Sequence, residues 1–141
     1  MRLKGLLEPL ESSLEFQDII QGIESKRYPI GIYGASESGR GYIISGIFEN
    51  TNRSIVVVTQ SDMEAKNLYE DLIFYTSEVY YFPVKEMVFY NIDAISGDLR
   101  WARLKVINEI LNNKKKIIVT SIEAFAAKYT PHNLSLIHIS E

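Results

Sequence analysis

Four short apolar runs, separated by segments with helical periodicity, constrain the fold of this chain most strongly. The two clearest runs are "SIVVVTQ" (54–60) and "KIIVTS" (116–121), which are apolar nearly throughout and do not alternate with polar residues. Strands of this kind are buried on both faces, which is typical of parallel sheets covered by helices. Shorter runs at 30–33 ("IGIY") and 79–82 ("VYYF") bring the expected strands to four. We therefore predict an α/β fold, a three-layer parallel sheet flanked by helices, with right-handed crossovers.

The segments between these strands place apolar residues on one helical face. Residues 62–75 repeat apolar positions at i, i+3, i+4 and i+7, and Ser61 and Glu64 precede them as a capping box. Ser12 and Glu15 form the same pattern before an N-terminal helix. Further helices are predicted after the glycines near residue 40, over 99–111 and from residue 122, with a loop at 84–95.

Composition narrows the classes of function. The chain has 141 residues, enough for one domain with a core, and its net charge of −3 gives no overall basic field that would attract nucleic acid. It has no cysteine, which excludes disulfides, thiolate zinc sites and a cysteine nucleophile. Neither a signal peptide nor an apolar run long enough to span a bilayer is found, so we expect a cytoplasmic protein without a membrane partner.

A glycine-rich stretch lies between the first expected strand and the helix that follows it. "GASESGRG" (34–41) has the G-x-x-x-x-G spacing of a phosphate-binding loop, which continues with Lys and Ser or Thr. In such a loop, backbone N–H groups and a helix N-terminus surround an anion. The candidate phosphate-binding residues are Gly34, Ser36, Ser38, Gly39, Arg40 and Gly41.

The chemistry of this stretch departs from an active nucleotide site. Arg40 stands at the lysine position, and its planar guanidinium is bulkier than the ammonium that contacts the β- and γ-phosphates. Gly41 stands where a hydroxyl would hold Mg²⁺, and Glu37 adds a negative charge. The apolar strands end in "VVVTQ" and "IIVTS", without the aspartate that binds the metal. We assign no catalytic and no metal-binding residue, and we interpret the stretch as a phosphate loop that has lost its catalytic function.

Three alternatives stay open. The loop could belong to an ATPase fragment, or it could be a structural glycine turn. It also resembles the G-A-S-x-G-x-G turn of short-chain dehydrogenases, but its second and third glycines lie five and seven residues after Gly34, one residue too far in each case. Gln60 ends the second strand, so no acidic residue is present there to hold a ribose.

Three further stretches, taken in order with the glycine loop, carry a resemblance to a known family. They are "SIVVVTQSDMEAKNLYEDLIFY" (54–75), "YFPVKEMVFYNIDAISGDLRWARLKVINEIL" (81–111) and "KIIVTSIEAF" (116–125). Together they resemble the N-terminal region of bacterial transcription-repair coupling factor over about residues 28–130. Within them, the positions that match the family pattern are Phe82, Pro83, Glu86, Tyr90, Arg103 and Leu104, while Phe89 departs from it.

The resemblance implies a fold and a role. The family's N-terminal region is similar to the first domain (domain 1a) of UvrB, so it implies a P-loop NTPase-like fold with a degenerate phosphate loop. It further implies a module that does not hydrolyse ATP and that helps recruit UvrA to stalled RNA polymerase. ATP and Mg²⁺ would be bound by a separate motor domain that translocates on DNA and is absent from this chain.

The resemblance also implies a division of the chain. We expect an N-terminal helical segment at 1–27 and a partial UvrB-like α/β domain at 28–133. The last residues, "LSLIHISE" (134–141), look like translated sequencing adapter, and we expect them to be a truncated or non-native tail.

Overall fold

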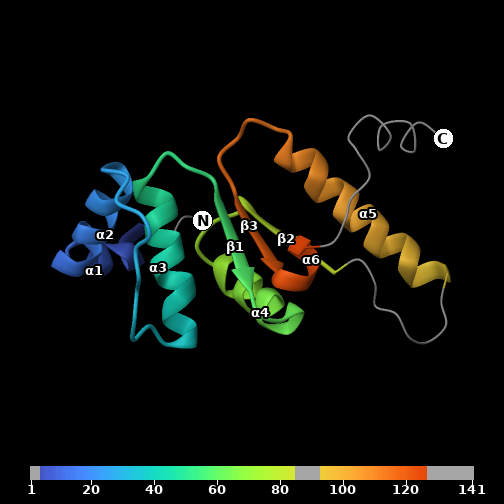
Figure 1. The fold of residues 1–141 in the computed structure, drawn as a ribbon, viewed down its shortest axis with the longest axis horizontal. Helices are drawn as coiled ribbons and strands as arrows, with labels where there is room; N and C mark the ends of the chain where they lie inside the picture. Colours follow the sequence, from blue (N-terminus) through green and yellow to red (C-terminus); the bar gives the residue numbers. More distant parts are fainter. Residues whose placement is uncertain (1–3, 85–92, 127–141) are drawn as a thin grey trace.

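The computed structural model describes residues 4–84 and 93–126 of the chain, and Figure 1 shows their arrangement. A three-stranded sheet lies at the centre, with helices on both of its faces. In chain order the elements are α1 (Lys4–Glu11), α2 (Leu14–Glu24), α3 (Glu37–Asn50), β1 (Ile55–Thr59), α4 (Asp62–Leu72), β2 (Val79–Phe82), α5 (Asp93–Ile110), β3 (Ile117–Ser121) and α6 (Ile122–Ala126).

The sheet is parallel and has the strand order β1-β3-β2. Val119 in the central strand β3 pairs with Val57 on one side and with Tyr81 on the other. Every residue of β3 is buried, including Thr120 and Ser121 at its end, as the apolar run "IIV" predicts for a strand covered on both faces. The predicted strands at 54–60, 79–82 and 116–121 are thereby confirmed, as is the parallel α/β class.

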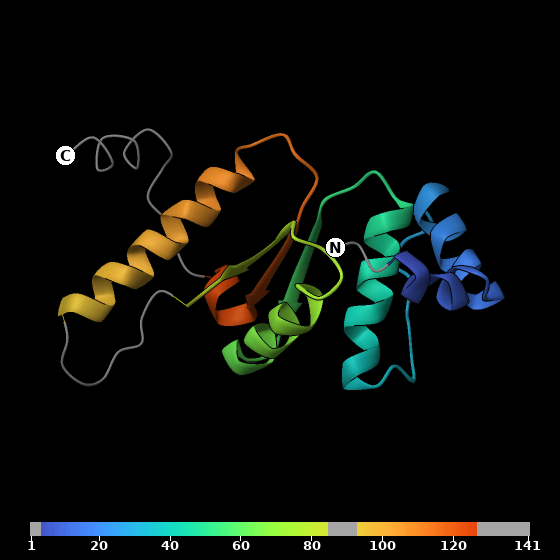
Figure 2. The same ribbon diagram turned by 180° about the vertical axis from the view of Figure 1, so that it is seen from behind.

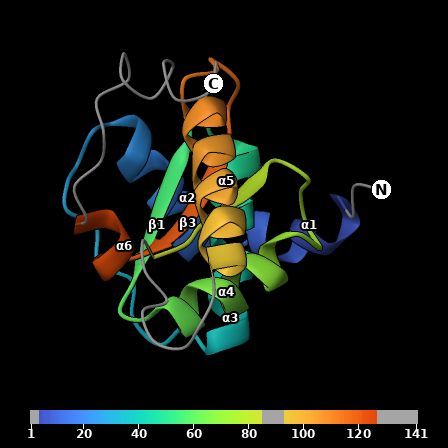
Figure 3. The same ribbon diagram turned by 90° about the vertical axis from the view of Figure 1, so that its right-hand side faces the viewer.

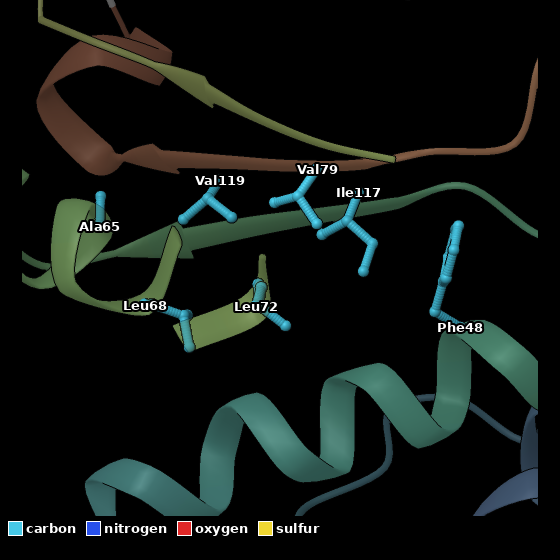
Figure 4. Close-up of a cluster of buried hydrophobic side chains, with 7 residues drawn as sticks. All are labelled: Phe48, Ala65, Leu68, Leu72, Val79, Ile117 and Val119. Atoms are coloured by element: carbon cyan, nitrogen blue, oxygen red, sulfur yellow. The ribbon is translucent and has the colours of Figure 1, made fainter. Parts of the chain in front are cut away.

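Two apolar clusters attach helices to opposite faces of the sheet. The first joins α3 and α4 to the sheet through seven buried side chains, drawn in Figure 4: Phe48, Ala65, Leu68, Leu72, Val79, Ile117 and Val119. The second joins α5 and α6 to the other face and consists of Phe82, Val84, Val106, Ile118 and Ala124. Figure 2 shows α4 and α5 on opposite sides of the strands. The predicted three-layer arrangement is therefore confirmed.

The N-terminal helices pack on α3, on the side away from the sheet, as Figures 1 and 2 show. In Figure 3, which has α5 in front, they lie behind the strands. Gly46 in α3 makes this contact close. A Cβ atom at Gly46 would lie 2.6 Å from Leu10 Cδ2 and 2.9 Å from Phe16 Cζ. The cap of α2 is one residue later than predicted, because the hydroxyl of Ser13 and not that of Ser12 accepts the amide of Phe16, at 3.2 Å.

The predicted strand at 30–33 is wrong. Residues 28–35 form no backbone hydrogen bond with any described residue, and they do not join the sheet. Ile32 and Tyr33 are 44% and 94% exposed. An apolar run becomes a strand only when a neighbouring backbone pairs with it, and none of the strands among residues 4–84 and 93–126 does so here.

The prediction that strand 54–60 is buried on both faces is also wrong. Val56 and Val58 are 54% and 42% exposed, whereas Ile55 and Val57 face the first cluster and are half-buried. The cause is the position of β1 at the edge of the sheet, while α5 packs on β2 at the opposite edge. Burial on both faces depends on which helix covers a strand, and that is a property of the whole fold.

The remaining boundaries differ little from those predicted. Ser61 caps α4 through its hydroxyl, which accepts the amide of Glu64 at 3.2 Å, but α4 ends at Leu72, before residue 75. Of the loop predicted at 84–95, residues 93–95 belong to α5, and 85–92 lie outside the described residues. The predicted tail at 134–141 also lies outside them. No helix in the described part of the chain is long and apolar enough to cross a membrane.

Candidate functional site

The glycine-rich stretch begins as a turn and becomes helical earlier than a phosphate loop would. Gly34 has a φ of +81°, a left-handed conformation that favours glycine. Ser36 is the N-cap of α3, and its Oγ accepts the amide of Gly39 at 3.1 Å. The amide of Arg40 donates to the carbonyl of Ser36, also at 3.1 Å. Gly39, Arg40 and Gly41 therefore lie inside the first turns of the helix.

The cap of α3 uses one of the donors that a phosphate would need. The first turn of a helix has up to four N–H groups without an intrahelical partner, and these are the groups that hold an anion. Ser36 takes the amide of Gly39, and the Oγ atoms of Ser36 and Ser38 lie 3.4 Å apart. Within the described part of the chain, the amides of Glu37 and Ser38 remain without a partner. The Ser36 side chain thus occupies one of the amides at the α3 terminus and leaves two of them open.

Arg40 lies among acidic side chains. A hollow of about 90 Å³ beside it is lined by Glu37, Glu64 and Asp71, together with Thr59, Asn67 and Leu68. The guanidinium of Arg40 forms no ion pair within 4 Å among the residues that the structure describes. Three carboxylates around one cation leave a negative local field, which disfavours a triphosphate.

Gly41 is buried because α3 and α4 pack closely at this point. A Cβ atom at Gly41 would lie 3.3 Å from the Cβ atom of Asp71 and 3.8 Å from Leu68 Cδ1. A hydroxyl-bearing side chain at this position would therefore point at α4. Sequence reasoning treated Gly41 as a lost magnesium ligand, and it could not see that α4 packs against this position.

A larger groove lies next to the glycine turn. Its volume is about 530 Å³, and it extends between residues 32–35, α3 and the outer side of β1. Its lining combines polar and apolar groups in similar measure and consists of Ile32, Tyr33, Gly34, Ala35, Arg40, Ile43, Ile44, Val57, Val58, Thr59, Gln60, Glu64 and Leu68. Of the six predicted site residues, the groove includes Gly34 and Arg40, while Ser36, Ser38, Gly39 and Gly41 are not part of its lining.

The polar residues where the strands end serve the local structure. At the end of β1, Thr59 Oγ1 donates to the carbonyl of Ser61 at 2.7 Å. At the end of β3, Ser121 Oγ accepts the amide of Ala124 at 3.2 Å, and Thr120 Oγ1 donates to the carbonyl of Phe82 at 3.0 Å. These side chains close turns and link strands. Their hydroxyl groups, which lie at the carboxyl edge of the sheet, are therefore already engaged in hydrogen bonds.

One carboxylate near this edge was missed by sequence reasoning. Asp62, in the first turn of α4, accepts a hydrogen bond of 2.5 Å from the hydroxyl of Tyr81 in β2. Burial raises the pKa of Tyr81, and the hydrogen bond and the negative charge of Asp62 raise it further. Asp62 is thus engaged with a neutral phenol. In the sequence, the position of Asp62 two residues after Gln60 indicated a carboxylate near the end of the strand. Its contact with Tyr81 depends on the order of the strands in the sheet.

Comparison with known proteins gives two relatives with the same description. The chain is 28% identical over 124 residues to the transcription-repair-coupling factor of Bacillus subtilis (strain 168). The matched stretch makes up 86% of this chain and 10% of that protein. It is 24% identical over 93 residues to the transcription-repair-coupling factor of Rickettsia prowazekii (strain Madrid E). Here the matched stretch makes up 64% of this chain and 8% of that protein.

The similarity concerns one part of much larger proteins. The chain spans about a tenth or less of the length of these relatives. No protein-family profile matches it, and no solved structure matches it. Over most of its length, the chain is similar to a portion of transcription-repair-coupling factors.

Proposed function

We propose that this chain is the N-terminal, non-catalytic module of a transcription-coupled DNA repair factor, with a UvrB-like fold and a degenerate phosphate loop. The module would help recruit UvrA to stalled RNA polymerase. In the complete protein, a separate motor domain would bind ATP and Mg²⁺ and translocate on DNA in the cytoplasm. The observation that carries this proposal is the similarity to a transcription-repair-coupling factor over 86% of the chain.

The geometry of the glycine stretch supports the non-catalytic part of the proposal. Ser36 occupies the amide of Gly39, three carboxylates line the hollow beside Arg40, and α4 packs against Gly41. In this proposal Gly34, Ser36, Ser38, Gly39, Arg40 and Gly41 are a vestigial phosphate loop that is kept as a folding element.

A cellular repair assay tests the role. In the complete protein, residues 28–126 are deleted, and removal of ultraviolet lesions is measured separately on the transcribed and the non-transcribed strand. We expect the preference for the transcribed strand to be lost, while the ATPase activity of the purified deletion protein stays within about twofold of the intact protein. Unchanged strand preference would contradict the proposed function.

One observation favours a second candidate, a nucleotide-binding enzyme fragment related to ATPases or short-chain dehydrogenases. The groove of about 530 Å³ reaches both Gly34 and Arg40, so a ligand would have space there. Titration of the chain with a fluorescent ATP analogue and Mg²⁺ separates the two functions. A Kd below about 100 µM that is weakened at least tenfold in Arg40→Ala would favour this candidate. If the chain is a non-catalytic module, the titration with the ATP analogue should not reach saturation in that concentration range.

A further inference from the structure

The helices α3, α4 and α5 all pack on the sheet, but their C-terminal ends differ in charge. At the end of α3, Lys115 Nζ donates to the carbonyl of Thr51 at 2.7 Å. At the end of α5, Lys116 Nζ donates to the carbonyl of Asn112, also at 2.7 Å. A cation at this end compensates the negative pole of the helix dipole. Helix α4 has no basic residue in its last turn, and the hydrogen bonds that close it within the described chain come from backbone amides.

The last turn of α4 carries two carboxylates in place of a cation. Glu70 and Asp71 are both exposed, and neither forms an ion pair within 4 Å among the described residues. Lys66 stands one helical turn before Glu70 and forms no such ion pair either. Negative side chains at the negative end of a helix are unfavourable. The end of α4 is therefore a place where a cation from another molecule would be stabilised.

Exposed apolar side chains adjoin these carboxylates. Ile73 and Phe74 follow α4 directly and are 47% and 69% exposed. Leu6 in α1 is 52% exposed. In Figure 3, α1 and the turn after α4 lie on the same side of the molecule. Large apolar side chains that gather at one place on a surface are typical of a site where another protein docks.

Two tyrosine rings join these side chains into one surface. Tyr42 of α3 and Tyr75 of the turn after α4 lie with their ring centroids 6.1 Å apart. The hydroxyl of Tyr42 donates to the carbonyl of Leu6 at 2.6 Å. Both rings are half-buried, so they bridge α1 and the turn while Phe74 stays exposed. We call this set of residues the Phe74 surface: Leu6, Tyr42, Ile73, Phe74 and Tyr75, with Glu70 and Asp71 beside them.

The backbone around the Phe74 surface is held in place by local contacts. The amide of Ile73 donates to the carbonyl of Tyr69 at 3.1 Å, and the amide of Tyr75 donates to that of Leu72 at 3.0 Å. Helices α3 and α4 also pack closely here, because a Cβ atom at Gly41 would lie 3.3 Å from Asp71 Cβ. A surface that is already formed loses little conformational entropy when a partner binds.

The charge of the Phe74 surface indicates which kind of partner fits it. A second copy of the chain would bring a second pair of carboxylates, and the phosphates of a nucleic acid or of an anionic membrane would be repelled in the same way. A protein segment with aliphatic side chains and a lysine or arginine at its edge complements both parts of the surface. Its basic side chain would take the position at α4 that Lys115 takes at α3 and Lys116 takes at α5.

We propose that the Phe74 surface docks a partner protein through a short amphipathic segment, whose aliphatic side chains cover Phe74 and Leu6 and whose lysine or arginine pairs with Glu70 and Asp71. The partner's cation then compensates the negative end of α4. This interaction goes beyond the proposed function, and it uses neither the glycine stretch nor the groove beside it.

A pair of synthetic peptides tests the chemistry of the occupant. A fluorescein-labelled amphipathic helix of about 14 leucine and lysine residues is titrated with the 141-residue chain, and its counterpart of leucine and glutamate is titrated in parallel. Fluorescence anisotropy gives both dissociation constants. We expect the lysine peptide to bind with a Kd on the order of 10 µM and the glutamate peptide to bind at least about tenfold more weakly. Equal affinity for the two peptides would overturn the proposal.

A variant pair locates the binding site. Phe74→Ser removes the most exposed aromatic side chain of the surface, and we expect it to weaken binding of the lysine peptide at least about tenfold. Met63→Ser is the matched control, because Met63 is 74% exposed and lies in the first turn of α4, roughly 16 Å along the helix from Phe74. That variant should bind within about twofold of the natural chain. Urea unfolding checks that both variants keep the fold, and unchanged binding by Phe74→Ser would contradict the assignment of the surface.

Charge reversal tests the place of the cation. In the double variant Glu70→Lys, Asp71→Lys, we expect the glutamate peptide to bind more tightly than the lysine peptide. A double variant that keeps the preference of the natural chain would show that these carboxylates play no part, and the proposal would be wrong. If sedimentation equilibrium instead shows dimers of the natural chain that Phe74→Ser abolishes, the occupant is a second copy and the proposal is also wrong.

Discussion

The hydroxyl of Tyr81 donates a 2.5 Å hydrogen bond to Asp62 Oδ1, which joins strand β2 to the first turn of α4. The two residues are 19 positions apart in sequence, and β1 and β2 lie on opposite sides of β3. The bond therefore depends on the sheet order being correct. It also places a charged acceptor beside a half-buried phenol.

Replacing Tyr81 by Phe removes this bond. We expect the free energy of unfolding to fall by about 1–2 kcal/mol, as for a hydrogen bond to a charged group in a partly buried site. Urea unfolding followed by circular dichroism measures the change. As a control, Tyr33→Phe, which alters a side chain that is 94% exposed, should change the stability by less than about 0.5 kcal/mol.

The raised pKa of Tyr81 makes stability depend on alkaline pH. Above the ordinary tyrosine pKa of about 10, the unfolded chain loses the Tyr81 proton while the folded chain keeps it. The unfolded state then binds fewer protons, so the free energy of unfolding falls as pH rises. Burial and nearby Glu109 also raise the pKa of Tyr80. Because Tyr80 is present in both the natural chain and Tyr81→Phe, its contribution to the pH dependence of stability is the same in both. We expect unfolding midpoints between pH 9 and 11 to fall more steeply for the natural chain than for Tyr81→Phe; parallel curves would contradict this.

Gly46→Ala tests the contact between the N-terminal helices and α3. The added methyl group would lie 2.6 Å from Leu10 and 2.9 Å from Phe16, so these side chains must move. We expect a loss of about 1–3 kcal/mol from overpacking, although alanine has the better helix propensity. Gly5→Ala in α1 is the matched control, because nothing lies within 4 Å of its added Cβ. That variant should be neutral or stabilising by up to about 1 kcal/mol.

Gly41→Thr restores a residue that a working phosphate loop has, yet we expect it to be destabilising. Its Cβ would start 3.3 Å from Asp71 Cβ, which leaves little space for a branched side chain between α3 and α4. Arg40 is exposed, so Arg40→Lys alone should leave the free energy of unfolding nearly unchanged. The double variant should melt below the natural chain and show no ATP turnover in a phosphate-release assay. Measurable turnover would refute the interpretation of the loop as non-catalytic.

Lys116→Met tests a buried helix cap. Lys116 is 3% exposed, and its Nζ donates to the carbonyl oxygens of Glu109 and Asn112 at the end of α5. A lysine at a helix C-terminus satisfies free carbonyls and interacts favourably with the helix dipole. We expect a loss of about 1–3 kcal/mol in thermal or urea unfolding. Lys114→Met, on an exposed neighbour, should change stability by less than about 0.5 kcal/mol.

The neighbouring lysines show where sequence and structure agree. The run "NNKKK" (112–116) is typical of a solvated helix end with cations near the negative pole of the helix dipole. Lys116 does lie at the end of α5, but it is buried, so the solvated part of this interpretation is wrong for Lys116. Lys115 lies instead at the end of α3, where its Nζ donates to Thr51 at 2.7 Å and to the carbonyl of Phe48. No local pattern could predict that contact, because it spans more than 60 residues of sequence.

By itself, the sequence determined the elements whose signals are local. Helix α4 follows from Ser61 and the apolar spacing of its buried residues, and β3 follows from an unbroken apolar run. Only the tertiary structure decided which strands have neighbours, so "IGIY" at 30–33 pairs with none of the described strands and Val58 in β1 is exposed at an edge of the described sheet. It also decided that Gly41 lies against α4 and that Asp62 meets Tyr81. Periodicity reports which side chains avoid water, whereas strand pairing and close packing depend on partners far away in the chain, which a local pattern does not specify.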